Sequence, residues 1–140
     1  MKIYIEGQPP TVTAQMKGAR CVPHAGGMIP RFYKTKNYKA AEQHYLSQMP
    51  QGVPARGPVG VRIRMSYAWR ASEPKKNRAQ GAMPKVTRPD VDNSVKIILD
   101  CLTKKCYWGD DAQVTELTAV KEFADTPGVE IHIWSIDGQN

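Results

Sequence analysis

The sequence predicts a small α/β fold of the α+β kind, in which two main helices cover a mixed β-sheet. Stretches of alternating apolar and polar residues occur near both ends and in the middle of the chain, and stretches with helical spacing lie between them. No segment repeats. A chain of 140 residues is long enough for one domain with a core and too short for two ordinary ones. We therefore expect a single domain over residues 1–140, with the element order β-α-β-α-β-β.

The first half of the chain predicts one strand, one basic irregular arm and one helix. The stretch KIYIEG alternates as a strand does, and a pair of prolines follows it. Residues 20–36 show no periodicity, which indicates a loop or a hairpin arm. Apolar residues then recur at intervals of three and four from Tyr38 to Met49, which predicts a helix that Asn37 caps and Pro50 ends.

The second half of the chain predicts three strands and the second helix. The stretch VGVRIRMSYAW, residues 59–69, alternates most clearly, and we expect its two arginines to face solvent. Residues 70–88 predict a long, mobile, basic loop. Residues 91–103 carry an apolar face at helical intervals. The stretches YWGDDAQVTELTAVKEF and GVEIHIWSI then predict two strands that pair as an antiparallel hairpin, because only the turn sequence ADTPG separates them.

Charge is divided unevenly along the chain. The net charge is +7, but residues 1–89 hold 16 Lys and Arg against 3 Asp and Glu, whereas residues 90–140 hold 4 against 10. A basic half attracts a polyanion such as nucleic acid, and a cluster of acids repels phosphate unless a cation stands between them. Charge alone leaves open a basic protein that has no nucleic-acid partner.

Basic side chains suited to DNA phosphates gather in the arm and in the loop. In the arm they flank Phe32 and Tyr33, whose rings can stack on bases, although lysines beside aromatic residues are also common as ordinary neighbours. In the loop they lead directly into the acidic region. The candidate DNA-binding residues are Arg31, Lys34, Lys36, Lys75, Lys76, Arg78, Lys85 and Arg88.

The sequence predicts neither a membrane-spanning segment nor a disulfide framework. No apolar run has membrane-spanning length, and the N-terminal stretch lacks the apolar core of a signal peptide, so we expect a cytoplasmic protein with no membrane partner. The three cysteines, Cys21, Cys101 and Cys106, are odd in number and match no zinc spacing, which favours reduced thiols. We expect Cys101 and Cys106 to be small buried apolar residues.

Two acidic clusters frame the second predicted helix. Asp90 and Asp92 stand at its start, and Asp110 and Asp111 follow it at the start of the next strand. If that strand returns beside the helix, three or four carboxylates converge, and such like charges are unfavourable without a cation. Mg²⁺ prefers carboxylate oxygens, and the absence of a nearby His disfavours zinc. The structural alternative is ordinary helix capping by the aspartates plus a surface ion pair between Asp92 and Lys96.

Carboxylate-bound Mg²⁺ suits the hydrolysis of a phosphodiester. Lys96, expected one turn after Asp92, could stabilise charge in the transition state or orient the attacking water. Two other functions use the same residue types. A nucleotidyl-transfer enzyme also needs paired carboxylates, although the chain has no glycine-rich phosphate loop. A non-catalytic basic DNA-binding module would use the acids only as caps and surface charges.

The stretch RPDVDNSVKIILDCLTKKCYWGDDAQV, residues 88–114, resembles the core motif of the RusA family of Holliday-junction resolvases. That motif has a D-x-D-N pair, a lysine, an Asp-x-Leu near the helix end and a Trp-x-Asp-Asp-x-Gln-Val segment. The resemblance implies a bacterial or phage-encoded homodimer that binds four-way junction DNA. It also implies paired symmetric nicks made with Mg²⁺, or Mn²⁺ in its place, in DNA recombination and repair.

Carried onto this chain, the resemblance assigns the site residue by residue. The metal-binding and catalytic acids are Asp90, Asp92 and Asp111, the catalytic lysine is Lys96, and Asp110 is an auxiliary acid. The chain departs from the family at Ser94, where leucine is common, and at Cys106, where glycine is usual. Neither change removes a charged group, so we expect the chemistry to be retained.

Overall fold

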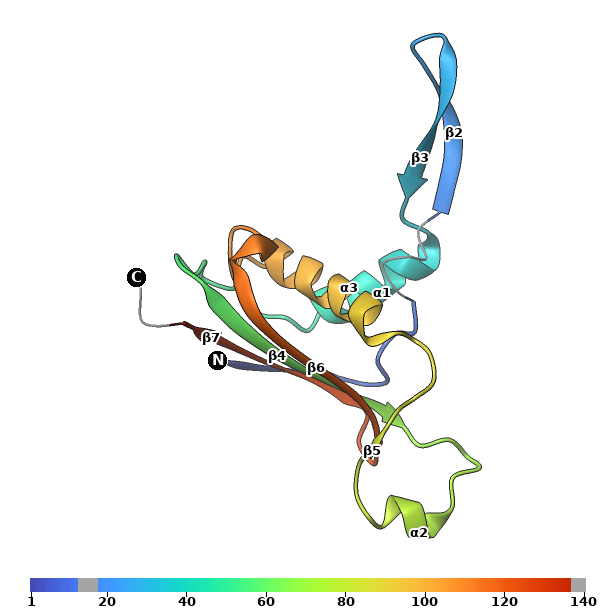
Figure 1. The fold of residues 1–140 in the computed structure, drawn as a ribbon, viewed down its shortest axis with the longest axis vertical. Helices are drawn as coiled ribbons and strands as arrows, with labels where there is room; N and C mark the ends of the chain where they lie inside the picture. The colour runs from blue at the N-terminus through green and yellow to red at the C-terminus, as the bar shows by residue number, and fades with distance from the viewer. Residues whose placement is uncertain (13–17, 137–140) are drawn as a thin grey trace.

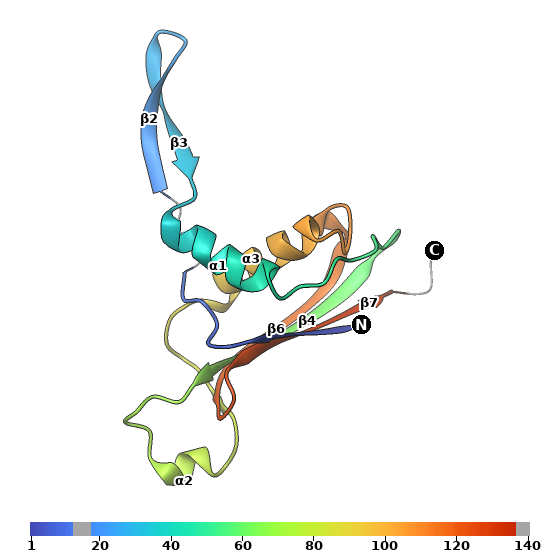
Figure 2. The ribbon, with the colours of Figure 1, turned by 180° about the vertical axis from the view of Figure 1, so that it is seen from behind.

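The computed structural model describes residues 1–12 and 18–136 and has a mixed five-stranded sheet with both main helices on one face (Figures 1 and 2). In spatial order the strands are β1 (Lys2–Glu6), β7 (Gly128–Ser135), β4 (Val59–Ala68), β6 (Val114–Ala124) and β5 (Met83–Pro84). The helices are α1 (Lys36–Leu46) and α3 (Val91–Lys104). The predicted class, a small mixed sheet with two main helices, is confirmed.

The predicted pairing of the last two strands is wrong. β6 and β7 are consecutive in the chain, but β4 lies between them and pairs with both, parallel to β6 and antiparallel to β7. The reason is the crossover through α3, because a helix that links two strands can return the chain in the same direction. β6 therefore joins β4 on one side, and β7 takes the other side between β4 and β1.

The core lies between the sheet and the two helices. Alternate residues of β4, namely Val61, Ile63, Met65 and Tyr67, are at most 2% exposed and form one core cluster with buried residues of α1 and α3. α3 is strongly amphipathic and buries most of the face that the sequence predicts, with Val91 and Leu99 only partly buried. Each large side chain that is fully buried in this layer contributes about 1.5–3 kcal/mol to stability. This packing fixes the position of α3, which carries most of the residues of the candidate site.

The far face of the sheet is largely open to solvent. On β4 this face carries the two arginines expected there, and Arg64 pairs with Glu122 of β6 at 2.9 Å. β5 pairs only with Glu122 and Phe123, so residues 114–121 of β6 have no strand neighbour on their outer side within the described chain. β6 is thus an edge strand over most of its length.

α1 begins earlier than predicted and is tied to α3 by a charged network. Thr35 rather than Asn37 is the N-cap, and its hydroxyl accepts a hydrogen bond from the Tyr38 amide at 3.2 Å. Glu42 of α1 pairs with Lys34 at 2.6 Å and with Lys104 of α3 at 2.7 Å. Burial raises the pKa of Glu42, but the hydrogen bonds from the two lysines outweigh burial and lower it overall.

Two basic segments project from the body (Figure 1). The stretch expected to be a loop or a hairpin arm is a regular hairpin of β2 (Gly18–His24) and β3 (Gly27–Tyr33), and it extends away from α1. The basic loop is not wholly irregular either, since it contains the short helix α2 (Lys75–Arg78) and β5. It projects on the opposite side of the body from the hairpin (Figures 1 and 2). Within the described residues, no helix is long and apolar enough to cross a membrane.

The end of α3 explains why glycine is usual at the position of Cys106. The Cys106 amide bonds the Thr103 carbonyl at 3.0 Å and the Tyr107 amide bonds the Leu102 carbonyl at 3.2 Å, which is the Schellman pattern. This pattern requires a left-handed residue, and Cys106 has a φ of 63°. Cys101 is buried as predicted, whereas the prediction for Cys106 is wrong because this turn leaves its side chain exposed.

We expect Cys106→Gly to stabilise the fold by about 0.5–1 kcal/mol, because glycine adopts positive φ without a Cβ penalty. Urea unfolding followed by circular dichroism measures the difference. Cys106→Ala is the matched control, since it removes the thiol but keeps the Cβ, and it should leave stability near that of the original chain. An equal gain from both variants would assign the effect to the thiol and not to the backbone.

Candidate active site

The start of α3 presents two exposed carboxylates. Asp90 is the N-cap residue by its backbone, with φ −68° and ψ 139°, yet its side chain makes no capping hydrogen bond. Asp92 follows in the first turn and is also exposed. An ordinary cap would use the Asp90 oxygens on free amide groups. Within the part of the chain that the structure describes, both side chains are therefore available to a ligand.

The segment that leads into Asp90 is anchored from the sheet. Lys121 of β6 donates hydrogen bonds to the carbonyl of Thr87 and, at 2.6 Å, to the carbonyl of Pro89. This contact fixes the backbone immediately before the first acid of the motif. Sequence reasoning missed Lys121, because it lies about 30 residues further along the chain and only the sheet register brings it back.

The second acidic cluster is held by the end of α3. Trp108 is 1% exposed, and its Nε1 donates to Thr103 Oγ1 at 2.8 Å. The Thr103 hydroxyl lies 3.3 Å from Asp111 Oδ1 and 3.1 Å from the Leu99 carbonyl, so it can donate to either oxygen. The tryptophan of the motif is therefore a buried support under Asp111, and Thr103 is a further member of the site that the sequence did not reveal.

The remaining residues of the second cluster form a reciprocal cap on η1 (Asp111–Gln113). Asp110 Oδ1 accepts from the Ala112 amide at 2.8 Å, and Gln113 Oε1 accepts from the Gly109 amide at 2.9 Å. The Gln113 side chain also donates to two carbonyls in the segment before β4. Asp110 thus has a local structural role, and Asp111 is the acid of this pair that faces α3.

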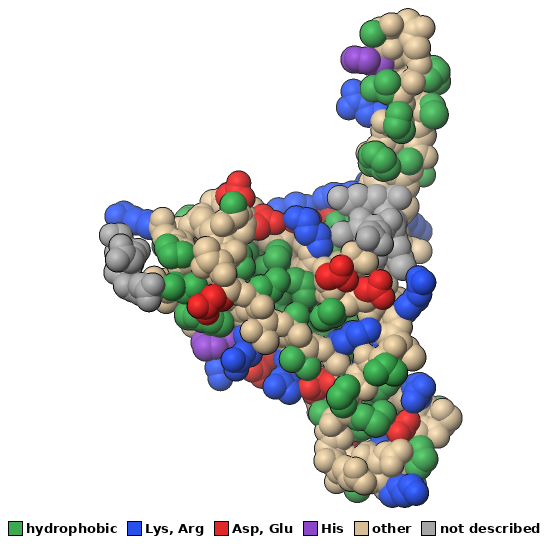
Figure 3. Space-filling model, viewed as in Figure 1, with side chains coloured by type: hydrophobic (Ala, Val, Ile, Leu, Met, Phe, Trp, Pro, Cys, Tyr) green, Lys and Arg blue, Asp and Glu red, His purple; other side chains and the backbone are tan. Residues whose placement is uncertain are grey.

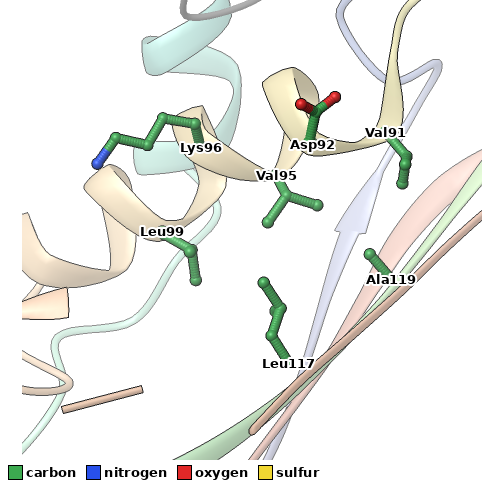
Figure 4. Close-up of a pocket in the computed structure, with 7 residues that line it drawn as sticks. All are labelled: Val91, Asp92, Val95, Lys96, Leu99, Leu117 and Ala119. Atoms are coloured by element: carbon green, nitrogen blue, oxygen red, sulfur yellow. The ribbon is translucent and has the colours of Figure 1, made fainter. Parts of the chain in front are cut away.

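Lys96 joins the helix to the second cluster. Its Nζ lies 3.0 Å from Asp111 Oδ2 and 3.1 Å from Asp100 Oδ1. The expected neighbour, Asp92, is not its partner, because the lysine side chain extends toward the C-terminal end of α3 (Figure 4). The hydrogen bond to Asp111, followed by that to Asp100, raises the pKa of Lys96, and the same bond lowers the pKa of Asp111. Lys96 is therefore an ammonium at neutral pH and not a general base.

An apolar groove separates α3 from β6 beside these charged groups. Val91, Val95 and Leu99 point from the helix toward Leu117 and Ala119 on the strand, with Asp92 and Lys96 on the rim (Figure 4). On this face of the molecule, acidic and basic side chains surround the apolar area (Figure 3). Leu117 is 48% exposed, which is unusual for a large aliphatic side chain beside a helix.

The acids lie in two places along α3. Asp90 and Asp92 are at its start, and Asp111 lies with Asp100 around Lys96. Among the residues that the structure describes, no three His, Cys, Asp or Glu side chains are grouped closely enough to hold a metal ion. The convergence of three carboxylates is thus not present in this arrangement. The donor set nevertheless fits Mg²⁺, which takes carboxylate oxygens and usually only one or two from the protein, with phosphate and water completing its shell.

The candidate DNA-binding residues differ in how freely they can reach a ligand. Lys34 pairs with Glu42, and Lys85 packs over the rings of Tyr67 and Phe123 at about 5 Å. Arg78 is half-buried and donates to the Arg70 carbonyl. The exposed candidates are Arg31, Lys36, Lys75, Lys76 and Arg88. The structure thus leaves the tip of the loop and the arm as the more accessible basic surfaces.

Comparison with known proteins identifies the family of the chain. The sequence model of the family described as Endodeoxyribonuclease RusA matches residues 9–134. The chain is 33% identical over 105 residues to the uncharacterized protein YqaN of Bacillus subtilis strain 168, covering 71% of this chain and 73% of YqaN. It is 28% identical over 127 residues to the crossover junction endodeoxyribonuclease rusA of Lactococcus phage r1t, covering 89% of both chains.

A shorter match of higher identity falls on a protein of the same name. The chain is 46% identical over 48 residues to the crossover junction endodeoxyribonuclease RusA of Escherichia coli strain K12, which covers 34% of this chain and 40% of that protein. The family match spans the arm, the loop and both acidic clusters. The chain therefore belongs to the endodeoxyribonuclease RusA family and is an endonuclease of this Holliday-junction-resolving class.

Proposed function

We propose that residues 1–140 act as one endonuclease domain that resolves four-way DNA junctions by paired symmetric nicks, with Mg²⁺ as cofactor and Mn²⁺ able to replace it. The reaction would serve recombination and repair in the cytoplasm of a bacterium or of a phage-infected bacterium. The observation that carries the proposal is the pairing of Lys96 with Asp111, on the same helix whose start presents the exposed carboxylates of Asp90 and Asp92.

The proposed roles follow from what each side chain can do. Asp90, Asp92 and Asp111 would hold Mg²⁺, which when bound polarises the phosphate and activates water. The ammonium of Lys96 would offset negative charge that develops on the phosphate in the transition state. Thr103 and Trp108 would keep Asp111 oriented through the hydrogen bonds described above. The apolar groove beside the site would exclude water from one side of the reacting phosphate.

The two basic projections would grip the DNA on either side of the site. The arm and the loop leave the body at opposite ends, and α3 lies between them (Figure 1). In the arm, Arg20 stands directly across from Arg31. Like charges in such a cross-strand pair repel each other, and a phosphate between them would remove this cost. The loop is joined to the site directly, since it ends at Asp90.

Neutralising the loop should weaken junction binding. We expect Lys75→Gln, Lys76→Gln and Arg78→Gln together to lower affinity and to reduce the slope of log K against log salt by up to about 3, roughly one for each phosphate that the loop no longer neutralises. Fluorescence anisotropy over a salt series measures both. Lys2→Gln with Arg62→Gln, on the open face of the sheet, is the control. An unchanged slope of log K against log salt in the triple variant would show that the loop does not contact DNA phosphates.

We propose that the active form is a homodimer, because two symmetric cuts require two sites and an isologous dimer supplies them. The isolated arm supports this proposal. One of its faces carries no charge and consists of Ala19, Cys21, Pro23, Met28, Pro30 and Phe32. Met28 and Phe32 are 62% and 74% exposed in the single chain, and two-stranded hairpins are marginal without further packing. Sedimentation equilibrium measures the mass in solution, and a monomer at working concentrations would contradict the proposal.

The function itself is tested with a labelled four-way junction and a matched linear duplex, each with and without Mg²⁺, resolved on a denaturing gel. We expect Mg²⁺-dependent symmetric nicks on the junction alone. Equal cutting of the duplex would support nuclease activity but would contradict the proposed specificity for junctions. Binding of the junction without any cleavage would instead favour a non-catalytic DNA-binding module.

A further inference from the structure

The ammonium of Lys96 is shared between two carboxylates, and only one of them belongs to the proposed metal ligands. Lys96 Nζ lies at nearly equal distances from Asp111 and Asp100. If Asp111 also holds Mg²⁺, a single carboxylate serves two cations, which repel each other at short range. Metal binding then weakens the interaction between Lys96 and Asp111. The bond to Asp100 is the one that remains.

Stability does not account for an aspartate at position 100. Aspartate is a poor helix former, and a negative charge in the last third of α3 opposes the helix dipole. A lysine four residues before an acid is also the weaker order for a helical ion pair. The one ion pair of Asp100 within the described chain is with Lys96, and its side chain is 34% exposed. Two local effects thus disfavour this residue, and the ion pair with Lys96 offsets them only weakly.

We infer that Asp100 is a positioning residue, which keeps the ammonium of Lys96 in the site while Asp111 takes up the divalent cation. The inference rests on the proposed function, since it assumes that Asp111 is a ligand. Asp100 does not line the groove and is one turn further along α3 than Lys96. It therefore acts through Lys96 and not on the phosphate. Without Asp100, Lys96 would compete with the metal for Asp111. Once the metal had displaced Lys96 from Asp111, no carboxylate would hold its ammonium in the site.

Two variants of the full chain test the inference, Asp100→Asn and Asp100→Glu, with Glu130→Gln on the open sheet face as a control for charge. Calorimetric titration with Mg²⁺ alone measures metal affinity, and single-turnover cleavage at saturating Mg²⁺ and saturating enzyme measures the chemical step. We expect Asp100→Asn to weaken Mg²⁺ binding by about three- to fivefold and to slow cleavage by about tenfold or more. Asp100→Glu should recover most of the rate, because its carboxylate can still reach Lys96.

The expected pattern separates positioning from other roles. Junction affinity without Mg²⁺ and the unfolding midpoint of Asp100→Asn should stay near those of the original chain, whereas a structural role would lower the midpoint and spare the rate. Cleavage at the original rate in Asp100→Asn would overturn the inference. Complete loss of Mg²⁺ binding would also overturn it, by making Asp100 a ligand. If the original chain cuts no DNA, the proposed function fails, and the Mg²⁺ titration alone decides the role of Asp100.

Discussion

Asp92→Asn should reduce junction cleavage by about 10²- to 10³-fold while leaving junction binding equal or tighter. The exposed Asp92 carboxylate stands on the rim of the groove and has no hydrogen-bond or ion-pair partner among residues 1–12 and 18–136. Replacing Asp92 with the nearly isosteric asparagine removes the negative charge and one of the oxygens that could bind the metal. Removing one group that stabilises a transition state lowers the rate constant by roughly 10²- to 10³-fold. The same change removes a charge that repels phosphate, which is why binding should not suffer.

Glu116→Gln is the matched control for Asp92→Asn. Glu116 is an exposed acid of β6 outside the site, so its neutralisation makes the same change in net charge and should leave cleavage unaltered. Cleavage is measured as a single-turnover rate and binding as anisotropy in the absence of Mg²⁺. A joint loss of cleavage and binding in Asp92→Asn would indicate misfolding or a wrong assignment. Undiminished cleavage would reduce Asp92 to a surface charge.

Lys96→Ala should slow cleavage by about 10²- to 10³-fold with the fold intact. Because the pKa of Lys96 is raised by its two carboxylates, the side chain supplies a permanent positive charge and not a titrating base. Its side chain is 53% exposed, so its ion pairs contribute at most about 1 kcal/mol to stability. The effect should therefore appear in the single-turnover rate constant and hardly at all in the urea midpoint.

Lys104→Ala provides the contrast on the same helix. Lys104 lies two turns after Lys96, is 45% exposed and pairs with Glu42 away from the site. We expect this variant to cut at the original rate and to lose some stability, because Glu42 is left with one lysine. If Lys96→Ala and Lys104→Ala behave alike in both assays, Lys96 is only a surface pair.

Local patterns in the sequence predicted the class of fold and most of the elements. Alternation identified β4, and helical spacing identified α3 together with its apolar face, because these periods are properties of consecutive residues. The partners of the last two strands were predicted wrongly for the same reason. Whether β7 pairs with β6 or with β4 depends on the crossover through α3, which a turn sequence does not encode.

The site was predictable to the extent that its residues are close in sequence. Asp90, Asp92, Lys96 and Asp111 could be proposed from spacing and from the family motif. The partner of Lys96 could not, since the choice between Asp92 and Asp100 depends on the direction in which its side chain extends. The supports below the acids, Thr103 and Lys121, are revealed only by hydrogen bonds that cross between elements.

Both acidic clusters are tethered to a single strand, β6. Asp111 lies in η1, which runs directly into the first residue of β6, and Lys121 near the far end of the same strand holds the backbone that precedes Asp90. A strand paired along β4 is stiff, so β6 acts as a spacer of fixed length between the clusters. A change in the contact between Lys121 and Pro89, or in the first turn of α3, would therefore alter the separation of the two clusters without any change in β6.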